Sequence, residues 1–509
     1  MRPTDTAEKV RLIARSDSEE AIFPILTALA HFERQAISYC YWKSSRRAGS
    51  VLNGEADVDL LIKKEDQYRA EAILLQQGLK RFPSVAWRDH PAISSFLGFD
   101  EAGGGLIHFH LHFRLIVGER LLKNYRIPWE KELLARAVPH PTLPIRILDP
   151  ASEAILLAVR ACLELRRLDP VTLRSWRATT KKFALDRKEL AARVDPMTLC
   201  ERATTLMSEE LAEMVADAIY GRQELETCRR LRRSMQAHFG PYRTYNALEA
   251  RLRSAWRIVL WAAGSLNKRL LHLPRPWSRR LPGGGCVVAL TGVDGSGKTT
   301  VGAAMRAWLA AEIDVIPIYF GTGNGRPSLL LWPLKLMVPI IERVLRNKPK
   351  GASRGNISSR PPGPIYGMLS TVWAMVVARE KRNKLLAARR GADRGMVVLT
   401  DRYPQNQIIG FNDGPLLARL TAVPLRLRRR EAAAYVLADR LPPDLVIKLM
   451  VTPETAARRE PDMNPEVIRQ RIGELRRLAF PGARVVCVDA EQPLAEVIRT
   501  VKHEIWREL

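Results

Sequence analysis

The sequence contains few cysteines, and they are not arranged as metal ligands. Six cysteines are scattered along 509 residues, with no CxxC pair and no Cys/His cluster at zinc-binding spacing. This pattern predicts reduced thiols and a cytoplasmic location. Residues 1–15 lack the apolar core of a secretory signal. No uninterrupted apolar run reaches the roughly 20 residues that cross a bilayer, so we expect a soluble chain.

Acidic residues are also scarce relative to basic ones. The chain has 54 Asp and Glu against 81 Lys and Arg, which gives a formal net charge of +27. Such a balance attracts anions, although an arginine-rich surface also follows from compositional bias. No aromatic and basic pattern of a nucleic-acid-binding type is found, so nucleic acid is not expected as a partner. Basic residues beside the apolar stretch 329–341, and the basic insertion around 342–360, leave peripheral contact with a membrane or another anionic surface open.

The hydropathy pattern divides the chain into unlike parts without an internal repeat. Residues 1–130 are expected to form a small mixed α/β domain, with strand candidates at 36–42, 58–62 and 106–115. Residues 131–271 are rich in Ala, Leu, Arg and Glu, which predicts a helical domain. The Pro-, Arg- and Gly-rich residues 272–285 are expected to be a linker. In residues 286–509 strands alternate with helices, which predicts a parallel sheet with helices on both faces. The predicted fold class is therefore α/β and multidomain.

A glycine-rich turn joins the apolar run 286–290 to a helical pattern that starts at Lys298. The turn reads GVDGSGKT and fits GxxxxGK[ST], the phosphate-binding loop. In such loops the backbone N–H groups face phosphate oxygens at a helix N-terminus. Lys298 would bridge the β- and γ-phosphates, and the Thr299 hydroxyl would bind Mg²⁺. The expected nucleotide contacts are Gly292, Gly295, Ser296, Gly297, Lys298, Thr299 and Thr300.

The extended string ALTGVDGSGKTT resembles the thymidylate kinase family. The resemblance implies ATP and Mg²⁺ as cofactors, and it places Asp294 near the sugar hydroxyl of a monophosphate acceptor. A carboxylate inside an anion-binding loop is unfavourable unless it accepts a hydrogen bond, which favours a role for Asp294. The strand-end sequence VVLTDRYP at 397–404 is similar to the family's DR[YF] motif. By this likeness Asp401 would lie near the metal, and Arg402 and Tyr403 would bind the acceptor.

Weaker likenesses extend over roughly residues 285–509. The segment 443–454 is similar to the family's late strand, and Arg458 and Arg459 after it would belong to a lid over the ATP phosphates. Arg469 and Arg471 are further lid candidates between which the pattern does not choose. The segment 485–490 resembles the strand and turn near the adenine, and Arg379 is the nearest match to a second acceptor-phosphate arginine.

The resemblance predicts a nucleoside monophosphate kinase, with dTMP and ATP giving dTDP and ADP as the family's reaction in dTDP biosynthesis. Lys298, Arg402, Asp401 and Arg459 would be its catalytic residues, and the family suggests a dimer. The segments 321–327 and 412–415 depart from the family's acceptor-binding sequences. A sugar, polyol or envelope-precursor acceptor is therefore an alternative, as is a nucleotide-gated binding or regulatory protein.

The N-terminal region carries a second pattern. Lys43-Ser44-Ser45 is followed by Asp57 and Asp59 on an apolar strand, which is similar to the nucleotidyltransferase superfamily. Residues at i and i+2 on a strand share a face, so both aspartates would hold metal ions. The superfamily expects a third carboxylate on a later strand, where this chain has His108, His110 and His112, with His110 the best candidate for its place. An altered metal site, a binding or regulatory domain, a Zn²⁺ site and a secondary nucleotidyltransferase activity are the alternatives.

Overall fold

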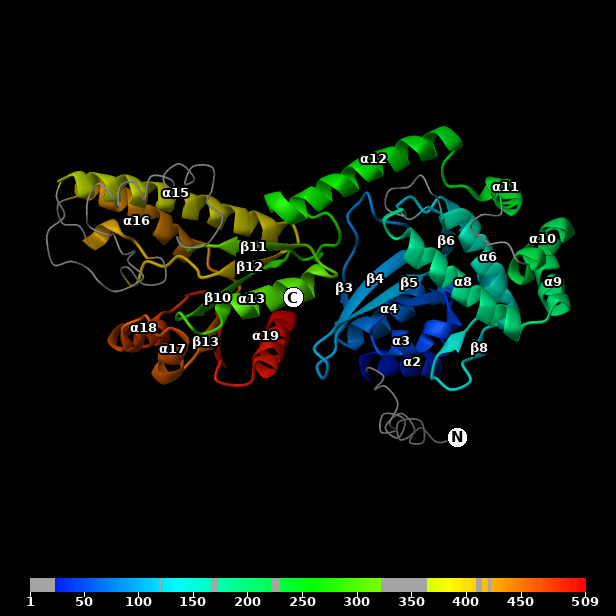
Figure 1. The fold of residues 1–509 in the computed structure, drawn as a ribbon, viewed down its shortest axis with the longest axis horizontal. Helices are drawn as coiled ribbons and strands as arrows, with labels where there is room; N and C mark the ends of the chain where they lie inside the picture. Colours follow the sequence, from blue (N-terminus) through cyan, green and yellow to red (C-terminus); the bar gives the residue numbers. More distant parts are fainter. Residues whose placement is uncertain are drawn as a thin grey trace. The chain divides into compact units, whose positions relative to one another are not determined.

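The computed structural model describes residues 23–119, 121–165, 173–221, 229–321, 364–408, 414–419 and 423–509. These residues form two compact units, Met1–Leu266 and Asn267–Leu509 (Figure 1). The apolar stretch 329–341, the basic insertion around 342–360, residues 322–327 of the segment 321–327 and residues 412–413 of the segment 412–415 lie outside the described residues. Among the helices of the described ranges, none is both long and apolar enough to span a bilayer.

A mixed seven-stranded sheet forms the centre of the first unit. Its strand order is β3-β4-β5-β2-β1-β9-β8, in which β2 pairs with β5, and β1 with β9, in parallel. A separate two-stranded sheet joins β6 to β7. The strands are β1 (Tyr39–Tyr41), β2 (Val58–Ile62), β3 (Lys80–Arg81), β4 (Ile93–Phe99), β5 (Leu106–His112), β6 (Leu115–Val117), β7 (Tyr125–Ile127), β8 (Val138–Pro139) and β9 (Arg146–Ile147).

Helices cover both faces of this sheet and continue into a helical layer (Figure 1). Asp149 caps α6 by accepting a hydrogen bond from the Ser152 amide at 3.0 Å, with Pro150 at the first helical position. The helices are α2 (Phe23–Arg34), α3 (Ala48–Leu52), α4 (Gln67–Gln76), α5 (Glu130–Ala135), α6 (Pro150–Glu164), α8 (Trp176–Arg193), α9 (Pro196–Thr204), α10 (Glu209–Tyr220), α11 (Arg229–His238) and α12 (Ala247–Leu266).

The alternation of side chains along the strands separates two hydrophobic cores. Leu60 and Phe109 pack with α2 and α4 in one core, whereas Trp42 and Leu61 pack with α6 and the helices after it in the other. Because the helical layer shares a core with the sheet, residues 23–266 form one compact unit. Asp59, His110 and His112 have the strand parity of Leu61, so they belong to the α6 face.

Two expected strand boundaries differ from the structure. Within 36–42 only Tyr39–Tyr41 is a strand, because Ala36, at φ 51°, ends the turn after α2. The strand expected over 106–115 ends at His112, and Leu115 begins β6, which pairs with β7 instead of continuing the large sheet. The predicted strand 58–62 coincides with β2.

The second unit is a five-stranded parallel sheet of order β11-β12-β10-β13-β14. Helices α13 and α19 lie on one face and α15 and α16 on the other (Figure 1), which confirms the expected α/β class. The elements are β10 (Cys286–Gly292), α13 (Lys298–Ala310), β11 (Val315–Tyr319), α15 (Pro364–Asp393), β12 (Val397–Asp401), α16 (Leu425–Arg440), β13 (Leu445–Met450), α17 (Pro453–Arg459), α18 (Pro465–Arg477), β14 (Arg484–Asp489) and α19 (Leu494–Glu508).

The segment 272–285 is tied to the second unit by backbone contacts. The Trp277 and Ser278 amides donate to Asp314 Oδ2 at 2.5 Å, and the Leu281 amide donates to the Gly395 carbonyl at 3.0 Å. Asp314 is buried and also pairs with Lys268 at 2.7 Å. The strand β10 that follows lies at the centre of the sheet, so its carboxyl end opens where nucleotide sites form in parallel α/β folds.

Candidate functional site

The loop between β10 and α13 has the backbone shape of a phosphate-binding loop. Gly295 and Gly297 have φ angles of 81° and 85°, in the left-handed region that glycine adopts without strain. A Cβ at Gly292 would lie 2.4 Å from Ser296 Oγ, so only glycine fits there without a shift of the serine. Ser296 Oγ is itself buried, and it has no hydrogen-bond partner in the described ranges. The loop therefore holds an unused polar group next to the N-terminus of α13.

Lys298 is the first residue of α13, and its ammonium group is folded back into the loop. Its Nζ donates to the Val293 carbonyl at 2.6 Å and lies 4.0 Å from Asp294 Oδ1. Burial, followed by the nearby Arg402 guanidinium, lowers the pKa of Lys298 to about 8. Asp294 and Asp401 act in the opposite direction on the same pKa. An incoming phosphate would supply the negative charge that this buried cation lacks.

Asp294 joins two arginines from distant parts of the chain. Its Oδ1 accepts from Arg402 at 3.0 Å, and its Oδ2 accepts from Arg471 at 2.9 Å. Arg402 follows β12 and Arg471 lies on α18, so β10, β12 and α18 meet at this carboxylate. Asp294 thus accepts the hydrogen bonds that a carboxylate in an anion-binding loop needs.

Arg402 adopts an uncommon backbone conformation. Its φ is 67°, and its amide donates to the Leu290 carbonyl at 2.9 Å, continuing the pairing of β12 with β10. A non-glycine residue in this region costs of order 1–3 kcal/mol, and such residues cluster at functional sites. Asp401 precedes it at the carboxyl end of β12, directly opposite Leu290. The expected Asp401-Arg402 pair therefore lies at the edge of the sheet beside the loop.

The lid arginines on α17 differ in their contacts. Arg459 reaches the loop and donates to the Gly295 carbonyl at 3.0 Å. Arg458 donates within its own helix, to Thr455 Oγ1 at 3.2 Å. Arg471, one of the two further lid candidates, pairs with the loop residue Asp294. Arg459 and Arg471 therefore contact the phosphate-binding loop, whereas the described contact of Arg458 is within its own helix.

The remaining residues predicted to bind the nucleotide or the acceptor differ in their exposure and in their contacts. Thr299 and Thr300 are exposed in the first turn of α13, next to the loop. Arg379 is exposed on α15, and no contact between it and the loop occurs among the described residues. Tyr403 is buried, and its hydroxyl donates to the Leu441 carbonyl. The roles expected for Arg379 and Tyr403 in acceptor binding therefore stay predictions.

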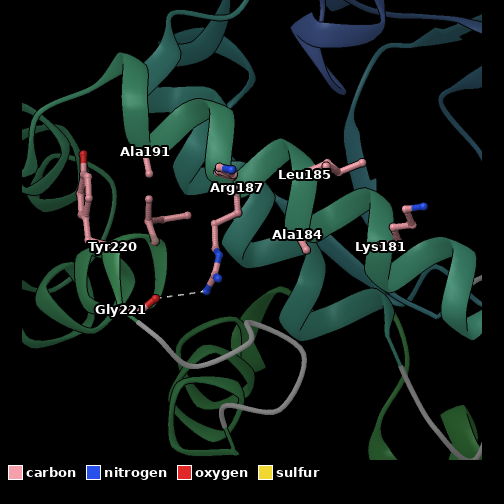
Figure 2. A pocket seen from close by; sticks show the side chains of 9 residues that line it. Lys181, Ala184, Leu185, Arg187, Ala191, Tyr220 and Gly221 are labelled. Carbon is pink, nitrogen blue, oxygen red and sulfur yellow. Dashed lines mark hydrogen bonds between the residues drawn. The ribbon is translucent and has the colours of Figure 1, made fainter.

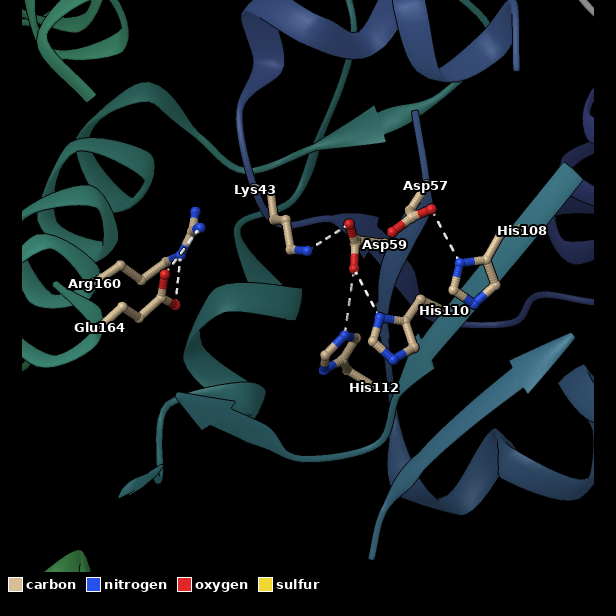
Figure 3. Close-up of polar contacts among 8 residues, drawn as sticks. All are labelled: Lys43, Asp57, Asp59, His108, His110, His112, Arg160 and Glu164. Carbon is tan, nitrogen blue, oxygen red and sulfur yellow. Dashed lines mark hydrogen bonds and ion pairs between the residues drawn. The ribbon is translucent and has the colours of Figure 1, made fainter. Parts of the chain in front are cut away.

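A second polar group lies in the first unit, on the α6 face of the sheet (Figure 3). Asp59 Oδ2 pairs with Lys43 Nζ at 2.6 Å, and Oδ1 accepts from His110 Nδ1 at 3.1 Å. His112 Nε2 lies 3.5 Å from the same Oδ1. Burial lowers the pKa of His112 to about 4, and burial also holds the pKa of His110 well below its usual value. Both imidazoles are thus neutral at pH 7.

The register of the sheet explains this grouping. Asp59 is directly opposite His110 in the parallel pairing of β2 with β5, which brings the two side chains together; that His110 stands in for a third carboxylate stays a prediction. Asp57, just before β2, contacts His108 instead, with Oδ1 and Nδ1 at 3.0 Å. The two aspartates of the motif therefore have different partners, and their joint role as metal ligands stays a prediction.

Several buried charged residues in the same unit were not predicted from the sequence. Arg160 on α6 lies over the Trp42 ring at 5.4 Å and donates to Glu164 at 3.1 Å. Burial, with Lys43 nearby, lowers the pKa of Lys123 to about 8. Burial raises the pKa of Glu153 to about 7, although its carboxylate accepts from the Ser45 amide at 2.8 Å. No local pattern marks these residues, because their partners lie far away in sequence.

A cavity of about 470 Å³ lies between α8 and the end of α10 (Figure 2). Arg187 crosses it and donates to the Gly221 carbonyl at 3.4 Å. Lys181, Lys188 and Tyr220 also line it. Among the described residues that line it there is no carboxylate, histidine or cysteine.

The sequence is similar to two ATP-binding proteins of Escherichia coli strain K12. It is 32% identical to the uncharacterized ATP-binding protein YghS over 217 residues, which is 42% of this chain and 89% of YghS. The chain belongs to the YghS family. It is also 26% identical to the uncharacterized ATP-binding protein YghR over 238 residues, which is 45% of this chain and 89% of YghR. The similarity to YghS and YghR thus spans less than half of this chain. No protein-family profile matches the sequence.

Proposed function

We propose that the second unit, residues 267–509, binds ATP with Mg²⁺ and transfers its γ-phosphoryl group to a small acceptor. The observation that carries the proposal is the convergence of cations at the loop. Lys298 lies within 4.0 Å of Asp294, Arg402 and Arg471 pair with Asp294, and Arg459 contacts the loop backbone. A loop that only capped a helix would not need this many cations.

The arrangement suits phosphoryl transfer, which proceeds mainly by positioning and charge stabilisation. In the proposed reaction Lys298 binds the β- and γ-phosphates at the N-terminus of α13. Thr299 and Asp401 would hold Mg²⁺, whose charge offsets that of the phosphates. Arg459 and Arg471, from α17 and α18, would stabilise charge on the transferred group. The description of YghS and YghR as ATP-binding proteins supports the choice of nucleotide.

A nucleoside monophosphate, with dTMP first, is the acceptor that the thymidylate kinase-like motifs favour. One observation favours a sugar or polyol acceptor as the second candidate. Tyr403 is only 3% exposed, and its ring packs near Phe320 and Phe480 with centroids 5.5 and 6.4 Å away. With its hydroxyl on the Leu441 carbonyl, Tyr403 is held in the core of the unit and presents no face to a nucleobase.

A panel assay distinguishes these acceptors. ADP release from MgATP would be measured with each nucleoside monophosphate and with sugar and polyol acceptors, using the full chain and a Lys298→Ala variant. We expect one acceptor class to raise ADP release in the full chain, and Lys298→Ala to abolish the increase. ATP binding without any acceptor-dependent turnover would refute the transferase and favour a nucleotide-gated protein.

A further inference from the structure

The strongest unassigned cluster lies in the first unit, at Asp59, His110 and His112 (Figure 3). Each offers one ligand atom, and the three atoms lie within 4.8 Å of one another. The residues come from adjacent strands of the sheet, β2 and β5, so the backbone holds them rigidly. Figure 3 shows both imidazole rings turned toward the Asp59 carboxylate. We propose that Asp59, His110 and His112 form a binding site for a transition-metal ion of the Zn²⁺ type.

The spacing of the donor atoms supports a four-coordinate ion. Asp59 Oδ1 lies 3.1 Å from His110 Nδ1 and 3.5 Å from His112 Nε2. In a tetrahedral Zn²⁺ site with bonds of about 2.0–2.1 Å, ligand atoms are about 3.3–3.4 Å apart. These two distances fall on either side of this value. Each of them would need to change by only a few tenths of an ångström.

His112 supplies an independent indication. Its side chain is only 1% exposed, and its Nδ1 has no hydrogen-bond partner within the described part of the chain, whereas Nε2 lies 3.5 Å from Asp59 Oδ1, at the long limit of a hydrogen bond. A buried polar group without a partner is unfavourable, and such groups call for an explanation. Coordination of a metal ion through Nε2 would satisfy one of these nitrogens.

The surroundings also fit a site with one open position. Lys43 Nζ pairs with Asp59 Oδ2 at 2.6 Å, and the other oxygen, Oδ1, is directed at the two imidazoles. Lys43 would thus orient the carboxylate ligand without itself contacting the metal ion. The His110 side chain is 18% exposed, whereas Asp59 and His112 are almost fully buried. The cluster thus reaches solvent at His110, where water or an anion would complete the coordination. Two imidazoles favour Zn²⁺ over Mg²⁺, which prefers oxygen ligands.

Metal binding requires one proton to leave His110 Nδ1. In the structure this N–H donates to the ionised Asp59. On binding, the imidazole takes its other tautomer, with the proton on Nε2, and Nδ1 becomes a ligand. No oxidant, reductant or other co-reactant is involved.

The test uses the full chain after removal of metal with a chelator. Co²⁺ would be titrated while its visible absorption is recorded, and Zn²⁺ would then be added as a competitor. We expect one equivalent of Co²⁺ to give the intense visible bands of tetrahedral coordination, and Zn²⁺ to displace it. His112→Ala and His110→Ala should each weaken the affinity about 100-fold or more, because outer-shell partners alone contribute about 10–100-fold.

His31→Ala is the matched control. It removes another histidine of the same unit, on α2, which packs against the opposite face of the sheet, and should leave the Co²⁺ affinity unchanged. Circular dichroism would verify that each variant is folded, and the partly exposed His110 offers a variant with less effect on packing than His112. The proposal is overturned if no stoichiometric binding occurs, if both histidine variants bind as the parent does, or if thiolate-to-metal absorption shows that cysteines are the ligands.

Discussion

Removal of the negative charge from the phosphate-binding loop should strengthen ATP binding. Asp294 Oδ1 lies 4.0 Å from Lys298 Nζ, so a phosphate oxygen bound by Lys298 would lie roughly 7 Å from the carboxylate. At an effective dielectric constant of about 20, two unit charges at this separation repel by about 2.4 kcal/mol. Because Arg402 and Arg471 neutralise part of the carboxylate and Mg²⁺ part of the phosphate charge, we expect about 1 kcal/mol to be effective.

Asp294→Asn should therefore lower the ATP dissociation constant about fivefold, and it frees two arginines for the phosphates. Isothermal titration with MgATP would measure this in the full chain. If Asp294 also contacts the acceptor, as the family likeness implies, the same variant should turn over more slowly. Tighter ATP binding combined with slower phosphoryl transfer would indicate that Asp294 both repels ATP and contacts the acceptor.

The control is Asp444→Asn, which alters another carboxylate of the same unit that accepts from the Val287 amide at 2.7 Å. It should leave ATP affinity within about twofold, since it does not face the loop cations. The reasoning fails if Asp294→Asn weakens ATP binding by tenfold or more. That result would mean that the bridge to Arg402 and Arg471 is needed to shape the loop.

Three further predictions concern buried ionisable groups and one hydroxyl. Burial lowers the pKa of Lys298 to about 8, so ATP affinity should fall as the pH rises through 8, because the protonated cation is lost. Titration between pH 6.5 and 9.5 tests this, and Lys298→Ala should bind weakly without that pH dependence. The pKa of Glu153 is raised from 4.5 to about 7, so the folded chain keeps a proton that the unfolded chain has lost. The free energy of unfolding of the first unit should then fall between pH 4.5 and 7, by about 3 kcal/mol from this group, and Glu153→Gln, followed by urea unfolding, should remove that part of the decrease. Tyr403→Phe loses a buried hydrogen bond to the Leu441 carbonyl and should lower the free energy of unfolding by about 1 kcal/mol. An unchanged KM for the acceptor would show that the hydroxyl is structural. A large rise in that KM would show that the hydroxyl binds the acceptor.

Local patterns were enough to predict much of the second unit. The glycine spacing, the apolar run before it and the helical pattern after it placed the loop between β10 and α13. These features depend on neighbouring residues, so the sequence displays them directly. The same holds for β2, whose bounds match the apolar run Val58–Ile62.

Contacts between distant residues were not predictable in the same way. Asp294 and Arg471 are 177 positions apart, and only the packing of α18 against the loop selects Arg471 from the arginines around it. The end of β5 at His112 depends on the pairing of β6 with β7, which alternation along one strand does not reveal. Glu153 and Lys123 have perturbed pKa values because tertiary packing buries them.

The central claim is that the second unit transfers phosphate from ATP to a small acceptor. The most direct measurement uses ATP labelled with ¹⁸O in the γ-phosphoryl group, the full chain, Mg²⁺ and the acceptor panel, with products followed by mass spectrometry. The account predicts that the labelled phosphoryl group appears on one acceptor class, and that it does not appear with Lys298→Ala. Label found only in free phosphate or in unreacted ATP, across all acceptors, would contradict it.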